Sequence, residues 1–595
     1  MSRLALLFHI VLWAPIEGYP VLMCQTDKTI LGSDPSVIMG HQVGETSDRL
    51  TLLTPRQRYK VGDVLFLTHP VVPSTFTSLL YAEATPGLAT FVGATCGHDS
   101  NRAPIAPAMA LRLQAPGVVE VRGARAGGYG LVARTQPLYI HVGETGPCAA
   151  LRRAGVSSVA CGAQVKQSRF RLWNKGCESL LPLLVVRPQN AWQVRQTVEI
   201  AAAFNTSIST RSGGHSYYCA SMKRGSIHID LRDMKKRSQV FEDPQDPTKL
   251  YIQVETGNTF QDLADDPRYS KVHFVRPEVN GIGVGGWYTH GGAAPNGDGG
   301  QYGWGNQSVL AMDLVVASGD LLRLDAKSKH QDLWRAVRVA GSAFGVATSL
   351  TIQVWPNAPL PVRIYAFPSL SAPLKLYHAA AKLQTNTSRD DWSYDAPFSV
   401  HIMALQQSVT VTGLAIHLPL GRFVTIKPAV GSGITDADMD AWVSAQGVRP
   451  LQLLTLQSRA TLRALGDWES AMTAWSDAVN LAVGIGASLT SYGVLVTEDA
   501  AVVDALAERF WDSGKCLMLE VTSFGARTWV DGWCQADPKV EPDLVERLDP
   551  SYQKYKNLGR KGVDPSRYWG DALPLLRSTK LSWDPSHLFD GGLFD

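Results

Sequence analysis

The segment Arg211-Ser212-Gly213-Gly214-His215-Ser216-Tyr217 decides the fold that we predict for this chain. Its two adjacent glycines let the backbone pass close to a ligand, because they carry no Cβ atom. Successive backbone N–H groups in such a turn form a concave site for an anion such as a pyrophosphate. The same residues also fit a tight surface turn that carries a histidine, so the interpretation depends on the segments around them.

Strand-like and helix-like segments flank this turn. The apolar run 183–186, ended by Pro188, predicts a buried strand, and Asn190 is placed to cap the helix that follows it. Residues 207–210 predict a second strand that leads into the turn, and residues 227–231 predict a third. We therefore expect an α/β arrangement in which a ligand lies over the turn.

Two more glycine-rich segments follow. They are Asn280–Gly286, with Gly291 and Gly292 after it, and Gly341–Val346. Gly281, Gly283 and Gly286 match the spacing Gly-x-Gly-x-x-Gly, but no hydrophobic strand precedes them and no amphipathic helix opens at the third glycine, so we reject a nicotinamide-binding fingerprint. A glycine-rich surface loop is the simpler alternative. An irregular backbone laid against a flat ligand explains all three segments together.

These motifs occur in a fixed order that resembles a known family. Residues 182–230 contain the first turn, and GIGVGG, LWRAVRVAGSAFGVATSL and the tail YWGDALPLLRSTKLSWDPSHLF follow. Residues 178–595 resemble the berberine-bridge-enzyme-like FAD-linked oxidases, whose fold is of the p-cresol methylhydroxylase/vanillyl-alcohol oxidase type. The resemblance implies an α+β protein with a two-part FAD-binding domain at 165–356, an α+β substrate-binding domain at 357–540, and a C-terminal segment at 541–595 that returns to the FAD-binding domain.

The resemblance also implies FAD as the cofactor, joined covalently to His215 through its 8α-methyl group. Many relatives have a second link to a cysteine, but Val279 stands at the matching position, so we expect a single histidyl link. Cys219 lies near His215 in the sequence, and we expect a disulfide or a buried thiol there rather than a second link. The implied FAD-binding residues are His215, Arg211, Ser212, Gly213, Gly214, Ser216, Tyr217, Gly281, Gly283, Val284, Gly285, Gly286, Gly291, Gly292, Gly341, Gly345 and Val346.

The chemistry that the resemblance implies is removal of a hydride from a C–H bond next to oxygen or nitrogen, while a protein base takes the proton. Molecular oxygen then restores FAD and gives hydrogen peroxide. Tyr552 and Tyr555 keep the spacing of the family's Tyr-x-Asn-Tyr-x-Asp segment, which makes Tyr555 the implied base. A tyrosine with a pKa near 10 needs a neighbouring cation to ionise, and Lys554 or Lys556 can supply it.

Departures from the family pattern leave alternatives open. Lys554 and Asn557 replace Asn and Asp of the tyrosine segment, and Ala572 stands where the tail usually has Asn, so an ordinary buried tyrosine pair is also consistent. Trp287 occupies a position that usually holds histidine. The runner-up functions are therefore a dehydrogenase with another electron acceptor, or a catalytically retired flavoprotein with a binding role.

The region before the first turn predicts a β-sandwich over residues 19–150. Short apolar runs at 64–67, 108–113, 118–121 and 138–142 are broken by glycine and proline, which is typical of strands. A copper-binding or carbohydrate-binding module is the functional alternative, with His69, Cys96, His98 and His141 as available residues, but scattered histidines are more often structural. Residues 148–177 are less periodic and predict a linker.

Composition sets the remaining expectations. The chain has 595 residues, 45% of them hydrophobic, and a net charge of +3, which gives no reason to expect nucleic acid and favours a small-molecule substrate. Residues 1–18 resemble a signal peptide, so we expect a secreted protein with no membrane span. We expect no metal site, because no zinc-binding spacing occurs. An even number of cysteines fits disulfide formation in an oxidising compartment; they are Cys24, Cys96, Cys148, Cys161, Cys177, Cys219, Cys516 and Cys534. Three sequons, at Asn205, Asn306 and Asn386, fit a glycosylated protein.

Overall fold

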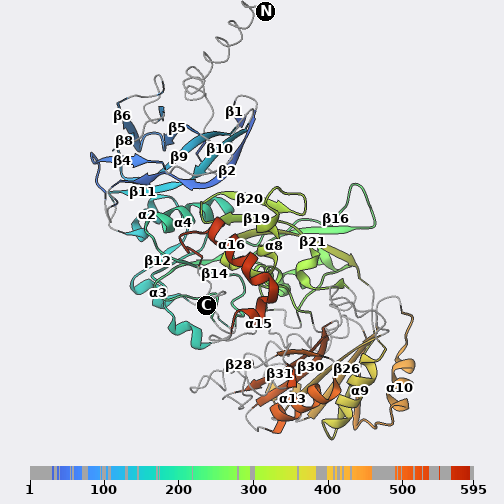
Figure 1. The fold of residues 1–595 in the computed structure, drawn as a ribbon. Helices are drawn as coiled ribbons and strands as arrows, with labels where there is room; N and C mark the ends of the chain where they lie inside the picture. Colours follow the sequence, from blue (N-terminus) through green and yellow to red (C-terminus); the bar gives the residue numbers. More distant parts are fainter. Residues whose placement is uncertain are drawn as a thin grey trace, which may run out of the picture.

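A computed structural model gives the fold in three successive parts, an N-terminal β-sandwich, a middle α/β part and a C-terminal α+β part (Figure 1). It describes residues 30–589 except 32–36, 39–40, 54, 56–58, 70–77, 94–95, 97–101, 105–108, 128–130, 144–145, 169, 171, 173–174, 217–218, 278–280, 295–301, 358–360, 384–397, 406–408, 412–415, 419–420, 429–431, 458–489, 492–493, 498, 513–515, 525–526, 535–547 and 550–563. None of the helices in this part of the chain combines the length and apolarity needed to cross a membrane. The predicted signal peptide lies outside it.

Two sheets form the N-terminal sandwich. The larger has the strand order β1-β2-β10-β9-β5-β7, with β11 paired to β9, and the smaller has the order β3-β4-β8-β6. Alternate residues such as Leu65, Leu111 and Val121 fill one apolar core between them, so the predicted period of two holds. The strands are β1 (Val37–Ile38), β2 (His41–Arg49), β3 (Thr51–Leu52), β4 (Val64–Thr68), β5 (Ser78–Ala84), β6 (Ala89–Val92), β7 (Arg102–Pro104), β8 (Met109–Leu113), β9 (Gly117–Gly127), β10 (Leu131–Gln136) and β11 (Leu138–Val142).

The middle part holds two sheets and short helices. One sheet has the order β12-β13-β15-β14, in which β13, β15 and β14 are parallel, and the other is antiparallel with the order β16-β17-β21-β19-β20 and β18 paired to β21. Its strands are β12 (Val159–Cys161), β13 (Leu184–Val186), β14 (Ile208–Arg211), β15 (Ile227–Asp230), β16 (Phe241–Glu242), β17 (Leu250–Glu255), β18 (Val272–His273), β19 (Val309–Val316), β20 (Leu321–Asp325) and β21 (Gly345–Pro356). Its helices are α2 (Pro147–Arg153), α3 (Ala163–Gln167), α4 (Ala191–Ala203), α5 (Phe260–Ala264), α6 (Val284–Tyr288) and α8 (Gln331–Ala340).

The βαβ unit before the first glycine turn forms as the sequence indicates. Asn190 caps α4, because its side chain accepts a hydrogen bond from the Gln193 backbone N–H at 3.0 Å. Val194, Val198 and Ala201 are fully buried on one face of the helix. The strand after α4 then ends at Arg211, which is the first residue of the glycine turn.

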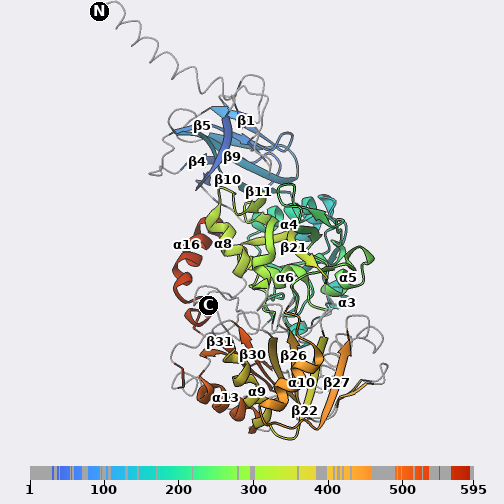
Figure 2. The ribbon, with the colours of Figure 1, turned by 90° about the vertical axis from the view of Figure 1, so that its right-hand side faces the viewer.

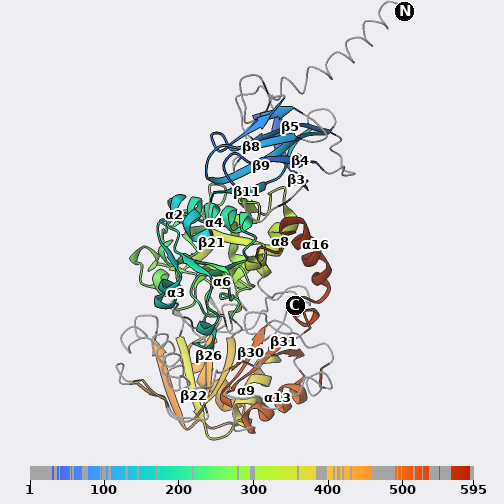
Figure 3. The same cartoon turned by 90° about the vertical axis from the view of Figure 1, so that its left-hand side faces the viewer.

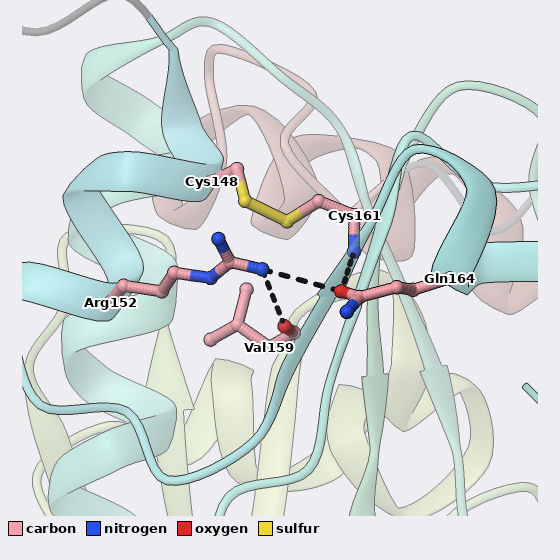
Figure 4. Close-up of a disulfide and its surroundings, with 5 residues drawn as sticks. All are labelled: Cys148, Arg152, Val159, Cys161 and Gln164. Atoms are coloured by element: carbon pink, nitrogen blue, oxygen red, sulfur yellow. Dashed lines mark hydrogen bonds between the residues drawn. A yellow bond between two sulfur atoms is a disulfide. The ribbon is translucent and has the colours of Figure 1, made fainter.

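The predicted linker at 148–177 is wrong. This segment forms α2 and α3, and its strand β12 joins the edge of the parallel sheet by pairing with β13. A disulfide between Cys148 and Cys161 ties α2 to β12, and Arg152 donates to the side chain of Gln164 at 3.3 Å beside it (Figure 4). Elements this short owe their order to a covalent bond and to pairing with distant strands, which periodicity does not reveal.

The main sheet of the C-terminal part has helices on one face (Figures 2 and 3). Its strand order is β27-β22-β26-β23-β30-β31-β28, with β29 paired to β31. β24 and β25 pair with each other in a separate antiparallel two-stranded sheet. The elements are β22 (Pro361–Phe367), α9 (Ser371–Ala381), β23 (Phe398–Leu405), β24 (Val409–Val411), β25 (Ile416–Leu418), β26 (Gly421–Pro428), α10 (Asp436–Ala445), β27 (Gln452–Gln457), β28 (Thr490–Ser491), β29 (Val494–Thr497), α13 (Ala500–Asp512), β30 (Cys516–Phe524) and β31 (Arg527–Cys534).

The end of the chain returns to the middle part as α15 (Ser566–Trp569) and α16 (Leu573–Trp583). Lys580 is buried and donates to the backbone carbonyl of Ala343 and to the carboxylate of Asp584. Phe589 is buried in the apolar core that also holds residues of β13, α4 and β15. Residues of this C-terminal segment therefore contact both halves of the middle part, more than 200 positions earlier in the sequence.

A buried ion network joins the sandwich to the middle part. Asp320, in the turn between β19 and β20, is fully buried, and it accepts from Arg122 at 2.8 Å and from Arg134 at 3.0 Å. Tyr139 donates a further hydrogen bond to the Ser318 carbonyl in the same turn. Burial alone would raise the pKa of Asp320, but the two guanidinium groups hold it below the ordinary value, so the carboxylate stays charged.

Asp320→Asn should weaken this attachment. Removing one partner of a buried ion pair costs about 3–5 kcal/mol, because the remaining charges stay buried without compensation. Calorimetry should therefore show a lower melting temperature for the sandwich in this variant. Asp313→Asn is the matched control, since its partner Arg323 is 46% exposed and such surface pairs contribute less than about 1 kcal/mol. Equal melting temperatures for both variants would contradict a structural role of the network.

Candidate functional site

The first two glycine segments cross each other in direct backbone contact. A Cβ atom placed on Gly213 would overlap with the backbone nitrogen of Gly283, and one placed on Gly283 would overlap with that of Gly213. Ser212 fixes the crossing, because its hydroxyl donates to the Thr256 carbonyl at 2.6 Å and accepts from the Gly285 N–H at 3.2 Å. The contact between the two loops therefore requires glycine at both positions.

The Arg211 side chain stabilises the first glycine turn. Its guanidinium donates to the Asp230 carboxylate at 2.9 Å and to the Gly213 carbonyl at 3.2 Å. Burial would raise the pKa of Asp230, but Arg211 and Arg232 lower it below the ordinary value. A charged carboxylate at the end of β15 thus fixes the backbone of the turn.

His215 is presented by this turn as a neutral imidazole. Its pKa is lowered to about 4, first by burial and then by the nearby positive charge of Arg211. Its side chain is partly exposed. Downstream, the Ser216 hydroxyl accepts from the Ala220 N–H at 2.9 Å, and Cys219 forms a disulfide with Cys177. The expectation of a disulfide at Cys219 is confirmed.

The second and third glycine segments are joined by His290, which the sequence interpretation missed. Its Nδ1 lies 2.8 Å from the Gly286 carbonyl, and its Nε2 lies 2.8 Å from the Ser342 hydroxyl. The Gly341 N–H also donates to the Thr289 carbonyl at 3.0 Å. In the sequence, only the position of His290 between two groups of glycines pointed to this residue. That position does not indicate that the imidazole contacts Ser342.

Several predicted site residues have packing roles. Gly345 and Val346 lie in β21, where Val346 is buried in the core and a Cβ at Gly345 would overlap with the Val315 carbonyl. Gly291 and Gly292 have φ values of 93° and 73°, which glycine adopts without strain. A short helix, α6, begins within the second glycine segment at Val284, two residues before the third glycine of the Gly-x-Gly-x-x-Gly spacing. The last described strand before this helix is β18, which has two residues and ends at His273, so the segment still differs from a nicotinamide fingerprint.

Tyr217, Val279, Tyr552, Tyr555 and the sequon at Asn386 lie outside the described residues. Within the described ranges, no group of three or more His, Cys, Asp or Glu side chains is arranged to hold a metal ion.

The described residues fit FAD. The crossing provides side-chain-free backbone next to a neutral imidazole, and Gly286 adds an exposed position where an added Cβ would meet no protein atom within 4 Å. Backbone N–H groups of such glycine loops suit a pyrophosphate.

Comparison with known proteins defines the class. Residues 182–325 match the family model described as FAD binding domain. The chain therefore carries an FAD-binding domain, and its cofactor is FAD.

Sequence relatives are oxidoreductases by name. FAD-linked oxidoreductase nodO of Hypoxylon pulicicidum is 29% identical over 179 residues, which are 30% of this chain and 38% of the relative. FAD-linked oxidoreductase ptmO of Penicillium ochrochloron is 30% identical over 195 residues, 32% of this chain and 41% of the relative. The chain thus spans about two fifths of the length of these relatives. Chitooligosaccharide oxidase of Gibberella zeae is 23% identical over 503 residues, 77% of this chain and 96% of the relative.

Solved structures show the same fold. Xylooligosaccharide oxidase from Myceliophthora thermophila C1, in complex with xylobiose, has a TM-score of 0.57 at 16% identity and covers 75% of this chain and 98% of its own. Berberine bridge enzyme in complex with (S)-reticuline has a TM-score of 0.56 at 17% identity and covers 75% of this chain and 97% of its own. The predicted α+β fold of the p-cresol methylhydroxylase/vanillyl-alcohol oxidase type is confirmed.

Gly213→Ala and Gly283→Ala should each yield protein with little bound FAD, because either methyl group forces the two loops apart. The measurement is the ratio of flavin absorbance to protein absorbance after purification. Gly146→Ala is the matched control, since a Cβ there meets no atom within 4 Å and its φ of 171° suits any residue. Full FAD content in Gly213→Ala would show that the crossing is not needed for FAD binding.

Proposed function

We propose that this protein is an FAD-dependent oxidoreductase that oxidises an alcohol, a sugar or a specialised metabolite at a C–H bond next to oxygen or nitrogen. The observation that carries the proposal is the neutral His215 imidazole beside the crossing of Gly213 and Gly283 in an FAD-binding domain. FAD, when bound, supplies the hydride acceptor. The chain's own residues bind the cofactor, orient the substrate and take the proton.

Molecular oxygen is the proposed electron acceptor, with hydrogen peroxide as product. The names of two relatives in the comparisons, a chitooligosaccharide oxidase and a xylooligosaccharide oxidase, support an oxidase. A dehydrogenase that uses another acceptor is the second candidate. We also propose that the protein is secreted, which the predicted signal peptide, the disulfides at Cys148, Cys177 and Cys516, and the exposed sequon at Asn205 support. We propose Tyr555 as the base, with Tyr552 three residues before it in the sequence.

Anaerobic reduction tests this function. Purified protein is mixed with xylobiose, a chitooligosaccharide or (S)-reticuline, and the flavin absorbance near 450 nm is followed. We expect at least one compound to bleach it, and air to restore it with one equivalent of peroxide. Restoration only by an added artificial acceptor would favour a dehydrogenase. Protein that dithionite bleaches but that none of these compounds reduces would contradict the proposed substrate classes.

We further propose a single covalent bond between His215 and the 8α carbon of FAD. In this step a C–H bond of the 8α-methyl group is replaced by a C–N bond to the imidazole, and oxygen removes the two electrons. His215→Asn should therefore release FAD in acid, whereas the wild type and the control His587→Asn should retain it. The control residue is exposed and has a φ of 52°, which asparagine tolerates.

Attachment should be nearly independent of pH between about 5.5 and 7.5. A pKa of about 4 keeps the imidazole neutral over this range, so the reactive form is lost only as the pH falls through 4. A histidine with the ordinary pKa of about 6.5 would lose roughly tenfold in rate over the same range. Flavin-free protein supplied with FAD, sampled by intact mass over time, distinguishes the two. A tenfold fall towards pH 5.5 would contradict a neutral imidazole with a lowered pKa.

A further inference from the structure

A disulfide lies close to the residue that we propose to hold FAD. Cys219 follows His215 by four positions in the sequence, and it is bonded to Cys177. Four residues span at most about 14 Å even when the chain is fully extended. The short chain between the two residues therefore transmits a displacement of Cys219 to His215, and the place of the disulfide restricts the place of the imidazole.

Cys177 gives this disulfide a rigid anchor. Its side chain is 1% exposed and packs in an apolar cluster with Val185 of β13 and with Met222. The neighbours of Val185 on β13, Leu184 and Val186, pack in the core that also holds α4. Because successive side chains of a strand point to opposite faces, the cluster covers the face of the parallel sheet opposite to α4. The disulfide thus ties the chain beyond the glycine turn to the sheet from which that turn begins.

The backbone at Cys219 suits glycine better than cysteine. Its φ is 66°, a left-handed conformation that glycine adopts without strain and that other residues adopt rarely. Local hydrogen bonds form this turn, since the Ser216 hydroxyl accepts from the Ala220 N–H at 2.9 Å and the Cys219 carbonyl accepts from the Met222 N–H at 2.9 Å. The covalent bond to Cys177 is therefore the physical reason for a side chain at this position.

We propose that the disulfide between Cys177 and Cys219 positions His215 for its attachment to FAD, so that this disulfide forms before the flavin becomes covalently bound. The inference rests on the proposed function, which assigns the covalent bond to His215. In the attachment step, a C–N bond forms while a C–H bond of the 8α-methyl group and the imidazole N–H bond break. The two hydrogens and the two electrons pass to molecular oxygen, which leaves as hydrogen peroxide. The disulfide itself stays oxidised throughout.

Double variants that leave no free thiol test this role. Cys177→Ala with Cys219→Gly removes the disulfide and places at 219 a residue that suits the φ of 66°. Cys148→Ala with Cys161→Ala is the matched control, because it removes a partly exposed disulfide that joins α2 to β12. Flavin-free protein of each kind, made in a riboflavin-starved host, is mixed with a series of FAD concentrations in air. Intact mass over time gives the limiting rate of attachment and the FAD concentration that gives half of that rate.

Loss of the disulfide between Cys177 and Cys219 should lower the limiting rate by roughly 10²-fold, because displacing a reacting group by about 1 Å has an effect of this size. The FAD concentration at half of the limiting rate should change by less than about threefold, since the glycine loops remain. The control should attach FAD at the wild-type rate. A role in stability alone would instead lower the melting temperature and weaken FAD binding, with the limiting rate unchanged.

A second arm does not depend on the folding of the first variant. The control variant is treated with dithiothreitol and desalted, and alkylation of a sample verifies that Cys177 and Cys219 are reduced. Its attachment rate should fall and should return after reoxidation with oxidised glutathione. An attachment rate within about threefold of wild type, in the reduced protein or in the variant without the disulfide, overturns the proposal. Wild type that binds FAD but never gains its mass contradicts the covalent bond itself, which is a different result.

Discussion

The contact between the backbones of Gly213 and Gly283 is the constraint on which the rest of the molecule depends. Neither residue can carry a side chain without pushing the other loop away. The two loops come from different sheets of the middle part, so their contact fixes how those sheets meet. It also fixes the place of His215, two residues beyond the crossing. A neutral imidazole next to bare backbone is the feature that unites the fold with its FAD-binding role.

Other interactions hold this crossing in place from several directions. The ion pair between Arg211 and Asp230 stabilises the first loop, and the His290 imidazole links the second loop to the third by hydrogen bonds. The disulfide between Cys177 and Cys219 anchors the chain four residues after His215. Further away, Asp320 joins the β-sandwich to the same part of the protein through two buried arginines. The site is thus fixed by charge pairs and a covalent bond in addition to apolar packing.

Local features of the site could be predicted from the sequence, and long-range ones could not. The glycine turn, the capped helix before it and the strand after it depend on neighbouring residues, so their types and spacing indicated them. The linker interpretation of residues 148–177 failed because β12 is ordered by pairing with β13 and by a disulfide. The disulfide between Cys177 and Cys219 joins residues 42 positions apart, and no pattern along the chain shows which of the cysteines pair.

An electron-density map of the purified protein with its FAD tests the central claim most directly. The account predicts continuous density from the His215 imidazole to the 8α carbon of the flavin. It also predicts that the pyrophosphate lies within hydrogen-bonding distance of backbone N–H groups at the crossing of the two glycine loops. FAD density that lies elsewhere, or Gly213 and Gly283 found apart with FAD between other elements, would contradict the account.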